Sequence, residues 1–208
     1  MVDGKQILAR LSNDPTNESK HMAPDILNRR NGMWKAAHAL AKPTAEKEAA
    51  IRTSDRWNRY EKKEKLAALV PDVQGLIAEA LKDRERISNT LAGLTKQVNT
   101  VPPRYVEPTV RQLRGMEIRQ VLRTLPEVER VKLFAEAAEQ NNTEHLDAVL
   151  TAPDRVLAPE VVTRGVEKWA QTTMPTVWAE REQTQLLYDQ VSSLVEHLNG
   201  WVRSLETE

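Results

Sequence analysis

The sequence predicts an all-α protein, a helical bundle with two long amphipathic helices and a compact group of short helices. Ala, Leu, Glu, Arg and Gln, which favour helices, are abundant, whereas Gly occurs 7 times in 208 residues. Apolar residues recur in steps of four and three along residues 66–98 and again along residues 176–205. This spacing keeps one stripe of a helix facing a neighbouring helix. Prolines separate most of the predicted helices, because proline cannot continue a regular helix.

The first 24 residues are mostly polar and show little apolar periodicity beyond Ile7, Leu8 and Leu11. Such a composition cannot bury enough apolar surface to order a chain by itself. We therefore expect residues 1–24 to form a flexible N-terminal arm, with at most one short helical turn at its start.

Two helices are predicted before the first long one. Asp25 is expected to cap a helix that Pro43 ends, because proline lacks an amide hydrogen and clashes with the preceding turn. Thr44 is expected to cap the next helix, which runs to about Val70 and is mostly charged. Within residues 52–65 of this helix, Trp57 and Tyr60 are the only large apolar side chains, so the helix needs a neighbouring helix or a partner surface to cover them.

The first long helix is predicted to start at Pro71, which suits the first turn of a helix better than a kink inside one. Its apolar stripe consists of Val73, Ile77, Ala80, Arg84, Ile87, Leu91, Leu94 and Val98. Arg84 is the polar exception in this stripe. It is interpreted either as a side chain that extends to solvent or as a polar group that sets the register of packing.

Residues 100–110 contain three prolines and form a predicted Pro-rich linker. The linker separates a basic helical region at 25–99 from an acidic helical domain at 111–208. Residues 1–65 have 14 basic and 9 acidic side chains, whereas residues 105–208 have 11 basic and 17 acidic ones.

Short helices follow the linker. One is expected near residues 109–123, and Thr124 with Glu127 reads as a capping box that starts the next. The pair Asn141-Asn142 indicates a turn, because Asn tolerates the left-handed conformation. Pro159 is expected in the first turn of a further helix. The second long helix closes the chain, and its stripe includes Tyr188, Val191, Val195, Leu198 and Val202.

The two long stripes are the predicted helix-packing interface. They could pair within one chain as a bundle or between copies as a coiled coil, and the matching lengths favour the bundle slightly. The predicted partners are therefore further copies of this chain, in a homo-oligomer, or other assembly proteins.

A basic segment gives an alternative function. Arginine, lysine and aromatic side chains that could pair with phosphates and stack on bases are Arg52, Arg56, Trp57, Arg59, Tyr60, Lys62 and Lys63. Acidic residues alternate with them and form helix-supporting pairs such as Glu61 and Lys65. Nucleic-acid binding is therefore kept as the alternative.

No catalytic or ligand signature stands out. The chain has no cysteine, its four histidines have no metal-ligand spacing, and its seven glycines are isolated. We expect no enzymatic activity, no cofactor, no metal and no small-molecule substrate. Neither a signal peptide nor a membrane-spanning run is visible, which indicates a cytoplasmic protein without membrane contact.

Residues 116–153 resemble a segment of uncharacterised helical proteins encoded by tailed phages and prophages. The residues that carry the resemblance are Glu117-Ile118-Arg119, Leu122, Leu125, Glu129-Arg130, Ala137-Ala138, Glu144, Leu146, Ala148-Val149-Leu150 and Ala152-Pro153. The resemblance implies a phage origin and assigns no active residues.

These observations together predict a non-catalytic structural protein that acts through helix–helix contacts. Its most concrete form is a component of a phage virion or of its morphogenesis, located in the host cytoplasm or in the assembled virion.

Overall fold

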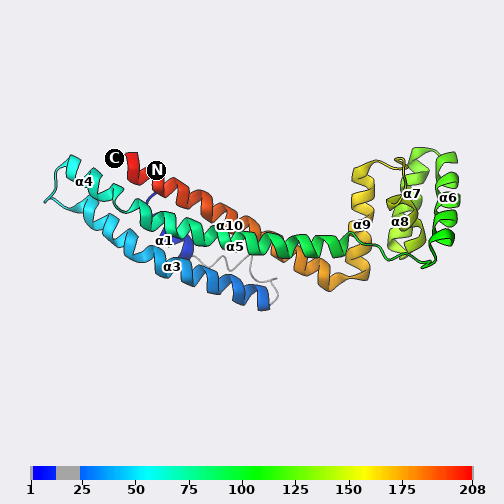
Figure 1. The fold of residues 1–208 in the computed structure, drawn as a ribbon, viewed down its shortest axis with the longest axis horizontal. Coiled ribbons are helices and arrows are strands. Elements are labelled where there is room, and N and C mark those ends of the chain that lie inside the picture. Colours follow the sequence, from blue (N-terminus) through cyan, green and yellow to red (C-terminus); the bar gives the residue numbers. More distant parts are fainter. Residues whose placement is uncertain (1, 13–23, 208) are drawn as a thin grey trace. The chain divides into compact units, whose positions relative to one another are not determined.

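The computed structural model describes residues 2–12 and 24–207, and these residues form helices and loops without a strand (Figure 1). The predicted all-α class is therefore confirmed. The chain divides into two compact units. Unit 1 comprises Met1–Leu91 and Gln183–Glu208, and unit 2 comprises Ala92–Glu182.

Unit 1 contains α1 (Gly4–Ser12), α3 (Pro24–Thr53), α4 (Arg59–Ala67) and most of α5 (Val70–Val98) and α10 (Pro175–Thr207). Within this unit α3, α5 and α10 run side by side (Figure 1). The core of unit 1 contains apolar side chains from α1, α3, α4, α5 and α10. It includes Ile7, Ala41, Ala45, Leu66, Val73, Leu198 and Trp201. The core explains why three long amphipathic helices are stable together.

Helix α1 corrects the prediction of a flexible arm for residues 4–12. Ile7 is fully buried and Leu11 is buried against unit 1's core. The close approach of α1 to α3 depends on Gly4, since a Cβ there would lie 2.6 Å from the Cβ of Ala45. A nine-residue helix is marginal in isolation, so this one forms because its apolar side is buried. The rest of the predicted arm, residues 13–23, lies outside the described residues.

Helix α3 corrects the prediction that Pro43 ends a helix. Pro43 lies inside α3, and Thr44, the predicted N-cap, is a buried residue of the same helix. An interior proline costs roughly 3 kcal/mol of helix stability. The buried residues on both sides of Pro43, including Ala41 and Ala45, offset this cost through packing.

The charged helix predicted for residues 44–70 is divided. Helix α3 ends at Thr53, and α4 begins after a turn with a capping box, in which Asn58 Oδ1 accepts from Glu61 N at 3.0 Å and Asn58 N donates to Glu61 Oε2 at 2.9 Å. This reciprocal pair satisfies two free amides at the start of α4. The predictions for α5 and α10 are confirmed, with Pro71 in the first turn of α5.

Unit 2 contains α6 (Pro108–Thr124), α7 (Glu127–Glu139), α8 (Thr143–Leu150) and α9 (Pro159–Thr173). Helix α8 packs against α6 and α7, and α7 packs against α9. The core of unit 2 is formed by Val98, Val101, Leu122, Phe134, Leu146, Trp169 and neighbouring side chains. Unit 2 therefore has an apolar core of its own.

Most of the local predictions for unit 2 agree with the structure. Pro159 starts α9, and Asn141 has a φ of 55° in the turn before α8. The capping box predicted at Thr124 is wrong, because α6 extends through Thr124 and its hydroxyl donates back to Val121 O at 2.7 Å. Pro126 is the N-cap of α7 and makes no side-chain cap bond.

The boundaries between the two units differ from those predicted from the prolines. The expected division was an arm at 1–24, a region at 25–99, a linker at 100–110 and a domain at 111–208. The observed divisions fall inside α5 and inside α10. Val98 and Val101 explain the difference, because both are buried in the core of unit 2.

Candidate interaction surfaces

The predicted helix-packing stripe is covered within the chain. In unit 1, Val73, Ile87, Val191, Val195 and Leu198 are buried, and Ile77, Ala80, Arg84, Leu91, Tyr188 and Val202 are half-buried. The two remaining positions, Leu94 and Val98, are buried residues of unit 2. The stripe therefore offers little free apolar surface to a second copy.

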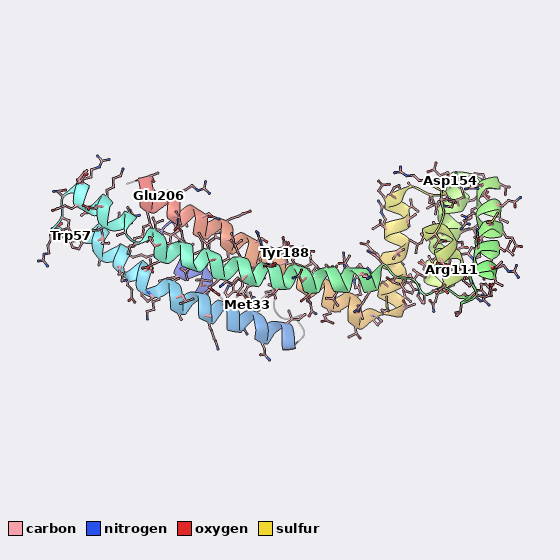
Figure 2. The ribbon with its side chains drawn as sticks, viewed as in Figure 1. Met33, Trp57, Arg111, Asp154, Tyr188 and Glu206 are labelled. Atoms are coloured by element: carbon pink, nitrogen blue, oxygen red, sulfur yellow. The ribbon has the colours of Figure 1, made fainter. Side chains whose placement is uncertain are left out.

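The stripes of α5 and α10 share clusters in unit 1. Ile87 of α5 packs with Leu187 and Val191 of α10, and Met33 and Tyr188, both labelled in Figure 2, pack against this cluster. Arg84, the polar exception in the stripe of α5, is half-buried. Of the two ways in which the stripes could pair, the structure has them pair within one chain.

A buried polar cluster joins α1, α3 and α10, and no motif in the sequence indicates it. Glu48 of α3 is 2% exposed and accepts three hydrogen bonds. The donors are Gly4 N at 2.8 Å, Trp201 Nε1 at 2.7 Å and Arg52 Nε at 2.8 Å. Arg52 also donates to Ser204 Oγ at 3.2 Å. Two of these partners are 44 and 153 residues from Glu48 in the sequence, so no local spacing reveals the cluster.

The basic segment lies at the turn between α3 and α4, where Figure 2 labels Trp57. A groove there is lined by Arg52, Trp57, Arg59, Lys62, Lys63, Leu66 and Thr207. Arg56 and Tyr60 are exposed, and Tyr60 is 79% exposed. The structure thus brings most of the predicted nucleic-acid contacts to one end of unit 1.

Two of these side chains already have partners within the chain. Arg52 pairs with the buried Glu48, and Lys62 Nζ donates to Arg52 O at 3.1 Å. Lys65 lies 4.8 Å from the centroid of the Trp57 ring and covers one of its faces. The charges left for a phosphate backbone are mainly those of Arg56, Arg59 and Lys63.

Exposed apolar side chains are concentrated in unit 2, and four lie on α6. Val110, Leu113, Met116 and Val121 are 40%, 57%, 54% and 59% exposed, respectively. The opposite side of α6 is packed, with Gly115, Arg119 and Leu122 buried. Helix α6 therefore has one side that is packed within unit 2 and another that exposes apolar side chains.

The open side of α6 follows a stripe through residues 110, 113, 117 and 121, spaced by three and four residues. We call Val110, Leu113, Glu117 and Val121, with the neighbouring Arg114, the α6 outer face. Arg114 NH1 donates to Glu117 Oε2 at 2.9 Å on this face. That bond raises the pKa of Arg114 above its ordinary value.

The α6 outer face is complementary to itself in one antiparallel arrangement. Val110 and Val121 are equally far from the middle of residues 110–121, and so are Arg114 and Glu117. A two-fold axis at that point would place each valine opposite the other valine and each Arg114 opposite a Glu117 of the second copy.

Residues 2–12 and 24–207 include no helix with the length and apolarity needed to cross a membrane. In the same part of the chain, histidines and carboxylates form no group of three or more that could hold a metal ion. Comparison with family models, with curated proteins and with solved structures finds no match to this chain.

Proposed function

We propose that this protein is a non-catalytic assembly protein whose copies associate through the α6 outer face. The observation that supports this proposal most is the open apolar stripe of α6, on a helix whose other side is already packed. Apolar side chains gathered on one exposed surface are typical of protein contact sites.

A second copy is the occupant that the charges favour. In the antiparallel arrangement, Arg114 and Glu117 pair across the axis, and the valines are covered without placing like charges together. Arg114 and Glu117 already pair with each other within α6, so the contact replaces this pair in each copy with a pair between copies.

The contact is expected to be weak. Helix α6 has 17 residues, and a single pair of such helices buries less than the roughly 1,600 Å² of a standard stable interface. Apolar burial gives about 25 cal/mol per Å², and loss of rotational and translational freedom offsets much of it. We therefore expect reversible, concentration-dependent association, which suits assemblies in which many weak contacts add up.

Sedimentation velocity across a concentration series tests the proposal. The protein is expected to pass from monomer to dimer, and Leu113→Glu is expected to keep it monomeric. The matched control is Leu40→Glu on α3, because Leu40 is 54% exposed and Leu113 is 57% exposed. A wild-type protein that stays monomeric throughout, or equal loss in both variants, would overturn the proposal.

Charge exchange tests the register of the contact. Arg114→Glu is expected to weaken association, and adding Glu117→Arg in the same chain is expected to restore it, because the pairs then form with reversed signs. Failure of the double variant to recover would reject this antiparallel arrangement.

We further propose that the assembly is a phage virion or an intermediate of its morphogenesis, which would place the protein in the host cytoplasm or in the assembled virion. The support is the resemblance of residues 116–153 to helical phage proteins, a segment that contains α7, α8 and half of α6. Neighbouring genes for portal, capsid or tail proteins would support this setting, and metabolic neighbours would contradict it.

A second candidate function is nucleic-acid binding at the α3–α4 turn. The observation that favours it is a groove in which Arg59, Lys62 and Lys63 lie beside Trp57, next to the exposed Tyr60. Such a site predicts an affinity for DNA or RNA that falls steeply as the salt concentration rises. Arg59→Glu is expected to lower this affinity at a given salt concentration. Lys82→Glu on α5 serves as the charge control. Absence of binding at low salt would reject this candidate.

A further inference from the structure

A second surface of α6 carries a positively charged groove. The groove lies in unit 2, between α6 and the segment that follows α8, and has a volume of about 680 Å³. Its polar lining consists mainly of Arg111, Gln112, Arg119, Gln120 and Arg123. Figure 2 shows Arg111 and Asp154 toward opposite ends of this part of unit 2. The volume is within the range of small-molecule sites, which are usually about 300–1,000 Å³.

The three arginines follow one ridge of the helix. Residues 111, 115, 119 and 123 are spaced by four, so they lie along one side of α6. Gly115 occupies the gap in this series. A Cβ at Gly115 would lie 2.9 Å from NH1 of Arg119, so the missing side chain leaves room for the Arg119 guanidinium against the helix.

Two of the arginines have carboxylate partners. Arg111 donates to both carboxylate oxygens of Asp147, with Nε at 2.7 Å from Oδ2, and this contact raises the pKa of Arg111 above its ordinary value. Arg123 NH2 donates to Asp154 Oδ2 at 3.1 Å. Their charges are compensated within unit 2.

Arg119 has no such partner. It is 8% exposed, and within the described part of the chain its guanidinium makes one hydrogen bond, from NH1 to Ala148 O at 3.0 Å, and no ion pair. A guanidinium has five N–H donors, and a buried arginine is normally paired with an anion because desolvation of an unpaired charge is costly. One positive charge in the groove is therefore uncompensated.

We propose that this groove binds the phosphate group of a small ligand, with Arg119 as the principal contact. The planar guanidinium matches phosphate oxygens with two parallel hydrogen bonds. Gln112 and Gln120 add neutral donors along the same groove. This number of donors fits the three or four oxygens of a phosphate better than the two of a carboxylate. Many phosphate sites use the backbone amides of a glycine-rich loop, which this sequence lacks, and in this groove arginine side chains would take that role.

The proposal is independent of association through the α6 outer face. Arg119 belongs to the packed side of α6, whereas Leu113 and Val121 are exposed on the outer face. Either property can fail without the other.

Calorimetric titration of the full-length protein with inorganic phosphate, at constant ionic strength, tests the groove. Saturable binding is expected in the wild type, with at least a tenfold loss in Arg119→Gln. Because Arg119 is buried, this variant could lose its fold, which circular dichroism would reveal. Gln120→Glu then decides, since it changes an exposed residue and places a carboxylate in the groove, and it is expected to weaken phosphate binding at least tenfold.

The matched control is Arg164→Gln, which removes an exposed arginine of α9 in unit 2 that does not line the groove. It is expected to bind phosphate like the wild type. Non-saturable binding, equal loss in Arg164→Gln, or acetate binding as tight as phosphate binding would each overturn the proposal.

Discussion

The side chain of Glu48 links three helices of unit 1. Its carboxylate is buried and accepts from the start of α1, from α3 and from Trp201 of α10. A buried carboxylate is tolerated only where hydrogen bonds and an opposite charge replace water, and Arg52 supplies that charge. The same contacts position α1, because Gly4 brings its amide to Glu48 and leaves no room for a side chain.

We predict that Glu48→Ala destabilises the protein by about 3 kcal/mol, because it leaves buried donors and the Arg52 charge without their acceptor. Urea unfolding followed by tryptophan fluorescence measures this change. Glu46→Ala is the control on the same helix, since Glu46 forms an exposed pair with Lys42 and its loss is expected to cost less than about 1 kcal/mol. Equal effects in the two variants would contradict the role assigned to Glu48.

Two glycines of unit 2 are expected to respond to alanine in opposite directions. A Cβ at Gly165 would lie 2.3 Å from Cε1 of the buried Phe134, so Gly165→Ala is expected to destabilise by about 1–3 kcal/mol. At Gly93, apart from the adjacent residues and the backbone of α5 itself, no atom lies within 4 Å of an added Cβ, so Gly93→Ala is expected to stabilise α5 by about 0.5–1 kcal/mol. Thermal unfolding of both variants checks this, and two shifts of the same sign would contradict it.

At the scale of elements, α6 has one side packed within unit 2 and one exposed side with apolar residues. One side packs on α8 and holds the arginine ridge, and the other carries the α6 outer face. Its start is fixed locally by Glu107, whose carboxylate accepts from Thr109 N at 3.1 Å and from Val110 N. These backbone hydrogen bonds lower the pKa of Glu107 below its ordinary value of 4.5.

The Glu107 cap predicts a pH dependence. Because its pKa is lower in the folded protein than in the unfolded chain, its stabilising contribution is complete at neutral pH and is lost as the pH falls from about 4.5 through the native pKa. The stability difference between the wild type and Glu107→Gln should therefore shrink on acidification. Urea unfolding of both proteins across that pH range measures the difference, and a constant difference would contradict the assigned cap.

At the scale of the whole molecule, unit 2 is one continuous stretch of chain, Ala92–Glu182, whereas unit 1 is built from two separate stretches. Unit 2 also has its own apolar core, to which the end of α5 and the start of α10 contribute. The linker prolines lie inside unit 2 and do not separate the units, because Val101 next to them is buried.

We predict that residues 92–182, expressed alone, fold into a helical domain with cooperative thermal unfolding, because their core is complete within this stretch. A shorter fragment that starts at residue 105 lacks Val98 and Val101 and is expected to be less stable. Circular dichroism during heating compares the two. A longer fragment that melts without cooperativity would contradict the prediction.

The sequence by itself determined the features that depend on neighbouring residues. The all-α class, the start of α5 at its proline, the extent of α10, the turn at Asn141 and the start of α9 follow from periodicity, capping and backbone preferences. Each of these signals lies within a few residues of the structure that it specifies, so no knowledge of the rest of the chain was needed.

Tertiary structure alone decided the rest, because contacts between distant residues outweigh local preferences of a few kcal/mol. Burial of Ile7 orders α1, and packing on both sides of Pro43 keeps α3 continuous. Pairing of α5 with α10 covers the stripe that the sequence offered as an interface. The candidate sites therefore lie on α6. One stripe of this helix is exposed, and Arg119 on its packed side has no carboxylate partner in the described part of the chain.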